Sequence, residues 1–262
     1  MKSKFIIVLL SCLSVILAGC ASRRAEEQDT IQERFARGQK LFERERWARA
    51  AEDFNWVVLN NPAGNLAAEA QYYYAECVFQ QKQYVEAQIE FERLLRRWAS
   101  TEHLIESRYR IVQCLVAQSP SYYYDQKATL DAIDELQAFI DDFPDSEERA
   151  EAEERITELR LKMARKYYES GRLYLKWRRP KPARLYFEMV LSQYYDTQYA
   201  DEARIGIVIS HIIGEDLDAA REFLDENSSR FARDKSKNTA RSYLEMAENG
   251  KFDLNYYIRL YQ

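Results

Sequence analysis

The stretch GQKLFERERWARAAEDFNWVVLNNP, residues 38–62, carries the pattern that decides the fold. Gly38 precedes Ala50 by twelve residues, Phe54 follows four residues after Ala50, and Pro62 follows eight residues after Phe54. Apolar residues between these points recur at helical spacing, and proline does not continue a helix. A pattern this short predicts a fold only if it recurs along the chain.

The same spacing occurs five times. An alanine is followed four residues later by a large apolar residue and eight residues after that by a terminating residue, in the sets Ala50-Phe54-Pro62, Ala87-Phe91-Ala99, Ala132-Leu136-Pro144, Ala183-Phe187-Tyr195 and Ala220-Leu224-Ala232. Ala75 and Gly171 repeat the place of Gly38, twelve residues before their alanines. Successive alanines lie 37, 45, 51 and 37 residues apart, so insertions lengthen the middle of the array. Amphipathic helices with alanines placed by chance are the alternative interpretation.

This pattern resembles the tetratricopeptide repeat. In that family a small residue in the first helix and an alanine in the second let two helices approach closely, and a proline stops the second helix. The composition agrees, because 7 glycines and 5 prolines in 262 residues are too few for a turn-rich all-β fold. We therefore expect an all-α fold, a tetratricopeptide-repeat superhelical solenoid of about five helix pairs with one long linking helix.

The repeats suggest a division of the chain. Repeats one to three occupy residues 31–146, and residues 147–248 hold the long linking helix and repeats four and five, followed by a short C-terminal tail, 249–262. The insertion SPSYYYDQ, residues 119–126, lengthens the loop within repeat three.

The linking helix is expected from about residue 147 to 177. Apolar residues recur there at helical spacing between charged ones, at Ile156, Leu159, Met163 and Tyr167. Two helices with a break near residue 161 are the alternative.

The N-terminus resembles a bacterial lipoprotein signal. Two lysines precede the apolar run FIIVLLSCLSVILA, residues 5–18, which is short for a membrane span but typical of a signal peptide. LAGC, residues 17–20, resembles a lipobox, in which Cys20 is lipidated and becomes the first mature residue. We expect a signal peptide at 1–19 and a lipidated tether at 20–30. An ordinary signal peptide or an uncleaved anchor is the alternative.

The residue after the cysteine bears on which membrane holds the protein. Lipoprotein sorting systems of this kind usually retain proteins with an acidic residue there in the inner membrane. Ala21 therefore favours the outer membrane, with the protein lipid-anchored at the periplasmic face.

Composition argues against several function classes. The net charge of −5 does not suit a nucleic-acid binder. His103 and His211 lie outside any metal motif, and neither a Gly-rich phosphate loop nor a nucleophile motif occurs. We expect no enzyme activity, no metal and no cofactor. Cys77 and Cys114, 37 residues apart at equivalent repeat positions, are expected to be two separate packing residues.

Helix positions that line the concave groove of tetratricopeptide proteins form an aromatic stripe beside amides and one carboxylate in the first three repeats. We expect an unfolded peptide to bind there, at Phe35, Gln39, Phe42, Tyr72, Glu76, Phe79, Tyr109 and Gln113. The alternatives are that the stripe is core, or that the linking helix or the N-terminus fills the groove.

The fourth repeat differs in character, since its corresponding positions carry Arg165, Tyr168, Arg172 and Lys176. We expect these residues to bind a different partner. The alternative is that Arg165 and Arg172 pair with acids on their own helix, such as Glu169.

Two long segments carry a closer resemblance: AIDELQAFIDDFPDSEERAEAEERITELRLKMARKYYESG, residues 132–171, and ARLYFEMVLSQYYDTQYADEA, residues 183–203. Together with the lipobox they resemble the BamD family of lipoproteins, over about residues 17–235. At the ends of the second and fourth repeats, where the family usually has proline, this chain has Ala99 and Tyr195.

The resemblance implies a scaffold on the periplasmic face of the outer membrane, in the machinery that assembles β-barrel proteins. N-terminal repeats of such proteins receive targeting segments of unfolded outer-membrane proteins. C-terminal repeats bind the outer-membrane β-barrel insertase, together with its accessory lipoproteins. The alternative function is that of a tetratricopeptide lipoprotein that serves as an adaptor for peptidoglycan or cell-envelope enzymes.

Overall fold

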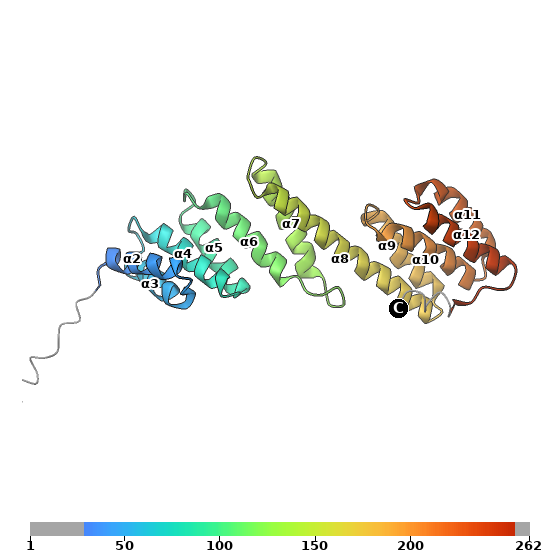
Figure 1. Ribbon diagram of the computed structural model, residues 1–262, viewed down its shortest axis with the longest axis horizontal. Helices are drawn as coiled ribbons and strands as arrows, with labels where there is room; N and C mark the ends of the chain where they lie inside the picture. Colours follow the sequence, from blue (N-terminus) through green and yellow to red (C-terminus); the bar gives the residue numbers. More distant parts are fainter. Residues whose placement is uncertain (1–28, 255–262) are drawn as a thin grey trace, which may run out of the picture. The chain divides into compact units, whose positions relative to one another are not determined.

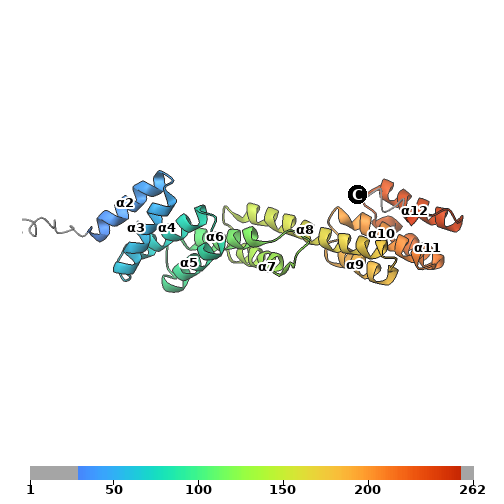
Figure 2. The same ribbon diagram turned by 90° about the horizontal axis from the view of Figure 1, so that it is seen from below.

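The computed structural model describes residues 29–254, which form α-helices joined by short turns (Figures 1 and 2). This part contains no strand, so the predicted all-α class is confirmed. The predicted signal peptide, Cys20 and the tail beyond residue 254 lie outside the described residues. The helices are α2 (Ile31–Glu43), α3 (Trp47–Asn60), α4 (Ala67–Gln80), α5 (Tyr84–Arg97), α6 (Leu104–Gln118), α7 (Lys127–Asp142), α8 (Arg149–Lys176), α9 (Pro180–Gln193), α10 (Tyr199–Ile213), α11 (Leu217–Asn227) and α12 (Asp234–Glu248), with a 3-10 turn at Ser228–Arg230.

The chain divides into two compact units. Among the described residues, the first unit comprises 29–83 and 93–101, and the second comprises 84–92 and 102–254. Within the first unit, α2 packs on α3 and α3 packs on α4. Within the second unit, each helix from α6 to α11 packs on the next, as expected of consecutive helix pairs, and α12 covers α10 and α11.

Small residues let the paired helices approach closely. The five repeat alanines are all fully buried, at Ala50, Ala87, Ala132, Ala183 and Ala220. A β-carbon added to Gly38 would lie only 2.9 Å from Cε1 of Phe54, and one added to Gly171 would lie 2.6 Å from Cε1 of Phe187. Glycine is therefore required at both positions, and the predicted repeat register is confirmed.

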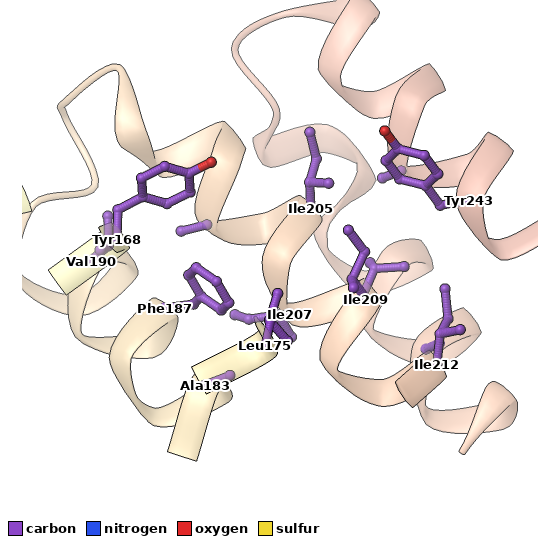
Figure 3. Packing of buried hydrophobic residues seen from close by; sticks show 14 of the residues in the cluster. Tyr168, Leu175, Ala183, Phe187, Val190, Ile205, Ile207, Ile209, Ile212 and Tyr243 are labelled. Atoms are coloured by element: carbon purple, nitrogen blue, oxygen red, sulfur yellow. The ribbon is translucent and has the colours of Figure 1, made fainter. Parts of the chain in front are cut away.

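Phe187 occupies the centre of the largest hydrophobic cluster, in the second unit. Its fully buried ring lies among Ala183, Leu175 and Ile207, which come from α9, α8 and α10 (Figure 3). Gly206 on α10 also abuts this ring, since an added β-carbon would lie 2.5 Å from its Cζ. One ring thus sets the spacing of three helices.

The turn between the two helices of a pair has the same backbone in four repeats. Five residues before each repeat alanine, the chain takes a left-handed conformation, with φ of 56°, 61°, 54° and 60° at Glu45, Lys82, Arg178 and Glu215. The first helix ends in a Schellman motif, in which the N–H of Arg46, for example, donates to the carbonyl of Leu41 at 2.9 Å. The third repeat instead carries the inserted loop at 119–126.

An aromatic residue ends the second helix of three repeats. Trp98, Phe143 and Tyr194 are the C-cap residues of α5, α7 and α9, and each leaves helical geometry with φ near −130°. The N–H of Tyr194 donates to the carbonyl of Val190, and the carbonyl of Tyr194 accepts from the N–H of Thr197. This turn stops the helix although Tyr195 replaces the usual proline.

The long helix α8 is continuous over 28 residues, which confirms the predicted linking helix and excludes the break near residue 161. Its first half places Ala152 and Leu159 in a core with α7. Its second half places Met163 and Leu175 in the core shared with α9 and α10. A single helix therefore belongs to two neighbouring cores and holds them together.

Ala50→Leu tests the repeat register. We expect the free energy of unfolding to fall by about 1–3 kcal/mol, because a larger side chain has no space between α2 and α3. Urea unfolding followed by circular dichroism measures the change. Ala36→Leu, the same substitution at an exposed position of α2, serves as the control. Equal unfolding curves for the two variants would contradict the register.

Lys82→Gly tests the strain of the left-handed turn. Glycine adopts positive φ without steric cost but loses more chain entropy on folding, so we expect a net stabilisation of about 0.5–1 kcal/mol. The neighbouring Gln83, at φ −86°, provides the control, since Gln83→Gly brings only the entropic loss. Thermal unfolding compares the two variants, and equal shifts of Tm would refute the strain.

Candidate partner-binding site

The loop at 119–126, between α6 and α7, is held in shape by buried polar groups. The amide of Gln126 is almost fully buried and donates to the carbonyls of Ser121 and Tyr124, at 2.8 and 3.1 Å. Its carbonyl oxygen accepts from the hydroxyl of Thr129 at 2.7 Å, and that hydroxyl also bonds the hydroxyl of Ser119. The loop is thus a defined structure that projects from repeat three.

Two lysines of α8 attach this loop to the long helix. Lys166 donates to the carbonyl of Tyr124 at 2.7 Å, and Lys162 donates to the hydroxyl of Ser119 at 2.8 Å. Lysines four residues apart lie on one face of a helix, so both reach the loop together. Burial lowers the pKa of Lys162, and the nearby Glu158 opposes this shift.

Aromatic rings extend the contact between loop and helix. The guanidinium of Arg165 lies 4.2 Å from the ring centroid of Tyr122, a cation–π contact, and the ring of Tyr123 lies 4.0 Å from that of Tyr122. Burial, more than the hydrogen bond with Tyr123, raises the pKa of the Tyr122 hydroxyl, and the charge of Arg165 opposes this shift. The outer ring, Tyr123, remains 75% exposed.

A pocket of about 300 Å³ lies between this loop and α8. We call it the loop–α8 pocket. Its lining combines two loop tyrosines with polar and apolar side chains of the helix, namely Tyr122, Tyr123, Lys166, Glu169, Ser170, Arg172, Leu173 and Lys176. The nearly buried Arg172 forms an ion pair with Glu169 at 3.0 Å. Three cations face one carboxylate, so the pocket suits an acidic or carbonyl-rich peptide segment with an apolar side chain.

Three of the four residues predicted to bind a partner meet at this pocket. Arg172 and Lys176 line it, and Arg165 supports the ring of Tyr122. Tyr168 instead lies in the core, 5.9 Å from the ring of Phe187 and 5.3 Å from that of Tyr199. The alternative interpretation was that Arg165 and Arg172 pair with acidic residues on their own helix. Arg172 does pair with Glu169, whereas Arg165 stacks on the loop residue Tyr122.

The predicted peptide-binding residues of the first unit form a mainly aromatic cluster. Phe35 is 6% exposed, and its ring packs on Phe54 at 5.6 Å. Phe42 is half-buried against Tyr73 at 5.2 Å. Glu76 is buried, and the remaining residues are half-buried, at Gln39, Tyr72 and Phe79. The structure thus makes Phe35 and Glu76 parts of the interior, and peptide binding by this set stays a prediction.

The other two residues of the predicted stripe belong to the second unit. Tyr109 is buried against Phe139, with ring centroids 5.2 Å apart, and burial together with Glu151 raises the pKa of its hydroxyl. Gln113 is half-buried and accepts a hydrogen bond from Arg110 at 2.7 Å. Tyr109 therefore stabilises the core of repeat three, and its binding role also stays a prediction.

Cys77 and Cys114 are both buried, as expected of packing residues. Burial raises the pKa of the Cys77 thiol to about 12, so the group stays protonated and unreactive at neutral pH.

Sequence reasoning did not identify Lys162, Lys166 or the loop tyrosines as parts of the site. The sequence does carry a weak signal, because the two lysines are four residues apart and so share one face of the predicted linking helix. That Lys162 and Lys166 donate hydrogen bonds to the loop becomes evident only in the folded structure.

Within residues 29–254, no group of three or more His, Cys, Asp or Glu side chains is arranged to hold a metal ion. In the same range, none of the helices has both the length and the apolar character that crossing a bilayer requires.

Helix-pair repeats with this spacing make the chain a tetratricopeptide-repeat protein. The model of the YfiO family of outer membrane lipoproteins matches residues 27–222, and the chain belongs to this family. It is 24% identical over 222 residues to the outer membrane protein assembly factor BamD of Rickettsia prowazekii (strain Madrid E), covering 81% of this chain and 86% of that protein.

Two solved structures are more distantly similar. A tetratricopeptide repeat protein from Parabacteroides merdae ATCC 43184 is 15% identical, with a TM-score of 0.36, over 84% of this chain and 74% of its own. The TPR2AB domain of yeast Sti1 in its pHSP90 complex is 13% identical, with a TM-score of 0.39, over 83% of this chain and 96% of its own.

Lys166→Ala tests how the loop is attached. We expect faster amide hydrogen exchange across residues 119–126, because the loop carbonyls lose their ammonium partner. Lys176→Ala removes a lysine from the same helix without removing a bond to the loop, so it should leave exchange there unchanged. Unaltered exchange in Lys166→Ala would show that the loop holds its position by its own hydrogen bonds.

Proposed function

We propose that the protein is a membrane-anchored periplasmic scaffold of the outer-membrane β-barrel assembly machinery. Its N-terminal repeats bind targeting segments of unfolded outer-membrane proteins, and its C-terminal repeats bind the barrel insertase. Acylation of Cys20 holds the scaffold at the periplasmic face of the outer membrane. The scaffold itself catalyses no reaction.

Membership of an outer membrane lipoprotein family supports the location, and the likeness to an assembly factor supports the process. The loop–α8 pocket is the observation that carries the binding role. It combines an exposed aromatic ring, Tyr123, with the cations Arg172 and Lys176 on a helix that two cores hold rigid. Rigid support of this kind lowers the entropic cost of binding a partner.

The second part of the proposal concerns unfolded clients. The aromatic cluster of the first unit offers half-buried rings and amides, at Gln39, Phe42, Tyr72 and Phe79. Rings of this kind pack on the side chains of an extended peptide, and amides bond to its backbone. Because Phe35 and Tyr109 are interior residues, Tyr72 is the more suitable position to vary.

Affinity purification from detergent-solubilised envelopes tests the proposed function. The lipidated protein should recover the barrel insertase, and its depletion should lower the amount of barrel proteins in the outer membrane. Recovery of peptidoglycan enzymes alone, with normal barrel proteins and a septation defect, would favour the adaptor role and overturn the proposal.

The double variant Tyr123→Ala, Lys176→Glu tests the pocket. We expect insertase recovery to fall by at least about tenfold, because the variant removes an aromatic contact and inverts a charge. Helicity should be unchanged, since both side chains are exposed. The matched control is Tyr195→Ala, Lys181→Glu, which makes the same changes at exposed positions outside the pocket. Equal losses in both variants would refute the assignment.

A further inference from the structure

Three arginines of the first unit surround the turn between α2 and α3. Arg44, Arg46 and Arg49 are all exposed, and their side chains form no ion pair or hydrogen bond with another residue in 29–254. Elsewhere on the same helix pair, Arg34 and Arg37 are both bonded to Asp53. On α2 and α3, the unpaired arginines are therefore confined to this turn.

The arginines line a single hollow of about 760 Å³. Its other lining residues are Leu41, Glu45, Trp47, Ala48 and Gln81. Three guanidinium groups thus face one carboxylate, in a chain whose net charge is −5. A concentration of cations that runs against the overall charge suits an anionic ligand.

Trp47 gives this hollow an amphipathic rim. Its ring is half-buried and packs edge-on against Phe42, with centroids 4.9 Å apart, so the indole is fixed in position. Tryptophan beside arginine is typical of protein surfaces at the boundary between membrane and water, where the ring meets acyl chains and the cation meets phosphate.

The turn also lies within reach of the proposed anchor. Thr30, the N-cap of α2, follows Cys20 by ten residues, and a chain of that length spans at most ~35 Å. The 13 residues of α2 add about 20 Å. A turn this close to an acylated cysteine can contact the surface of the same membrane.

We infer that the α2–α3 turn binds the phosphate groups of anionic phospholipids in the membrane that holds the anchor. Guanidinium groups donate paired hydrogen bonds to phosphate oxygens, and three around one hollow can hold one or two headgroups. The inference rests on the membrane location in the proposed function, but it requires neither the insertase nor an unfolded client. Contact at the turn would fix how the first unit is oriented at the surface.

Vesicle co-sedimentation tests the inference. The chain from residue 20 onward, carrying Cys20→Ser so that no acyl chain attaches, is mixed with phosphatidylcholine vesicles or with vesicles of equal parts phosphatidylcholine and phosphatidylglycerol. We expect binding only to the anionic vesicles, weakened by added salt. Each arginine near the surface contributes about fivefold, so Arg44→Gln, Arg46→Gln, Arg49→Gln should lower binding by at least about tenfold.

The matched control removes three charges from the corresponding turn of the fourth repeat, as Arg178→Gln, Arg179→Gln, Lys181→Gln. Arg178 lines a pocket with two acidic residues, Glu215 and Asp253, so carboxylates outnumber cations there, and binding should be unchanged. Equal losses in both triple variants would show a general charge effect and overturn the inference. So would equal binding to both vesicle types, or unchanged binding of the Arg44→Gln, Arg46→Gln, Arg49→Gln variant to the anionic vesicles.

Discussion

Both units depend on one kind of contact, in which a phenylalanine ring packs against a helix backbone at a glycine, where no side chain intervenes. Gly38 faces Phe54 in the first unit, and Gly171 faces Phe187 in the second. At such distances even a methyl group is excluded, so the two helices of each of these pairs have one spacing and one register. Within each of these pairs a Schellman motif with one left-handed residue, Glu45 or Arg178, reverses the chain in a short turn.

The second unit depends on the same contact in a further way. Phe187 touches Gly171 on α8 and Gly206 on α10, and this fixes the second half of α8 while α7 packs on its first half. A helix held at both halves is a rigid support. The loop at 119–126 attaches to it through Lys162 and Lys166, and the loop–α8 pocket results from that attachment. The candidate site is thus a consequence of packing between repeats.

The helix pairs, the long helix and the helix stops could be predicted from the sequence, since small residues, aromatic residues and helical spacing report directly on packing. Other features could not. The left-handed turns carry Glu45 and Lys82, where the usual glycine signal is missing. Phe35 and Tyr109 looked like groove residues but are buried, because helical spacing does not distinguish a core from a groove. The pocket depends on the attachment of the loop to α8 by Lys162 and Lys166, which are distant from it in sequence.

The central claim is that the loop–α8 pocket binds the barrel insertase. Site-specific photo-crosslinking in the living cell tests this claim most directly. A benzophenone side chain is placed at Leu173, which lines the pocket, or at Leu130 on α7, which lies outside it; each leucine is 43% exposed. We expect an adduct with the insertase from position 173 and none from position 130. Equal adducts from both positions, or an insertase adduct from position 130 alone, would contradict it.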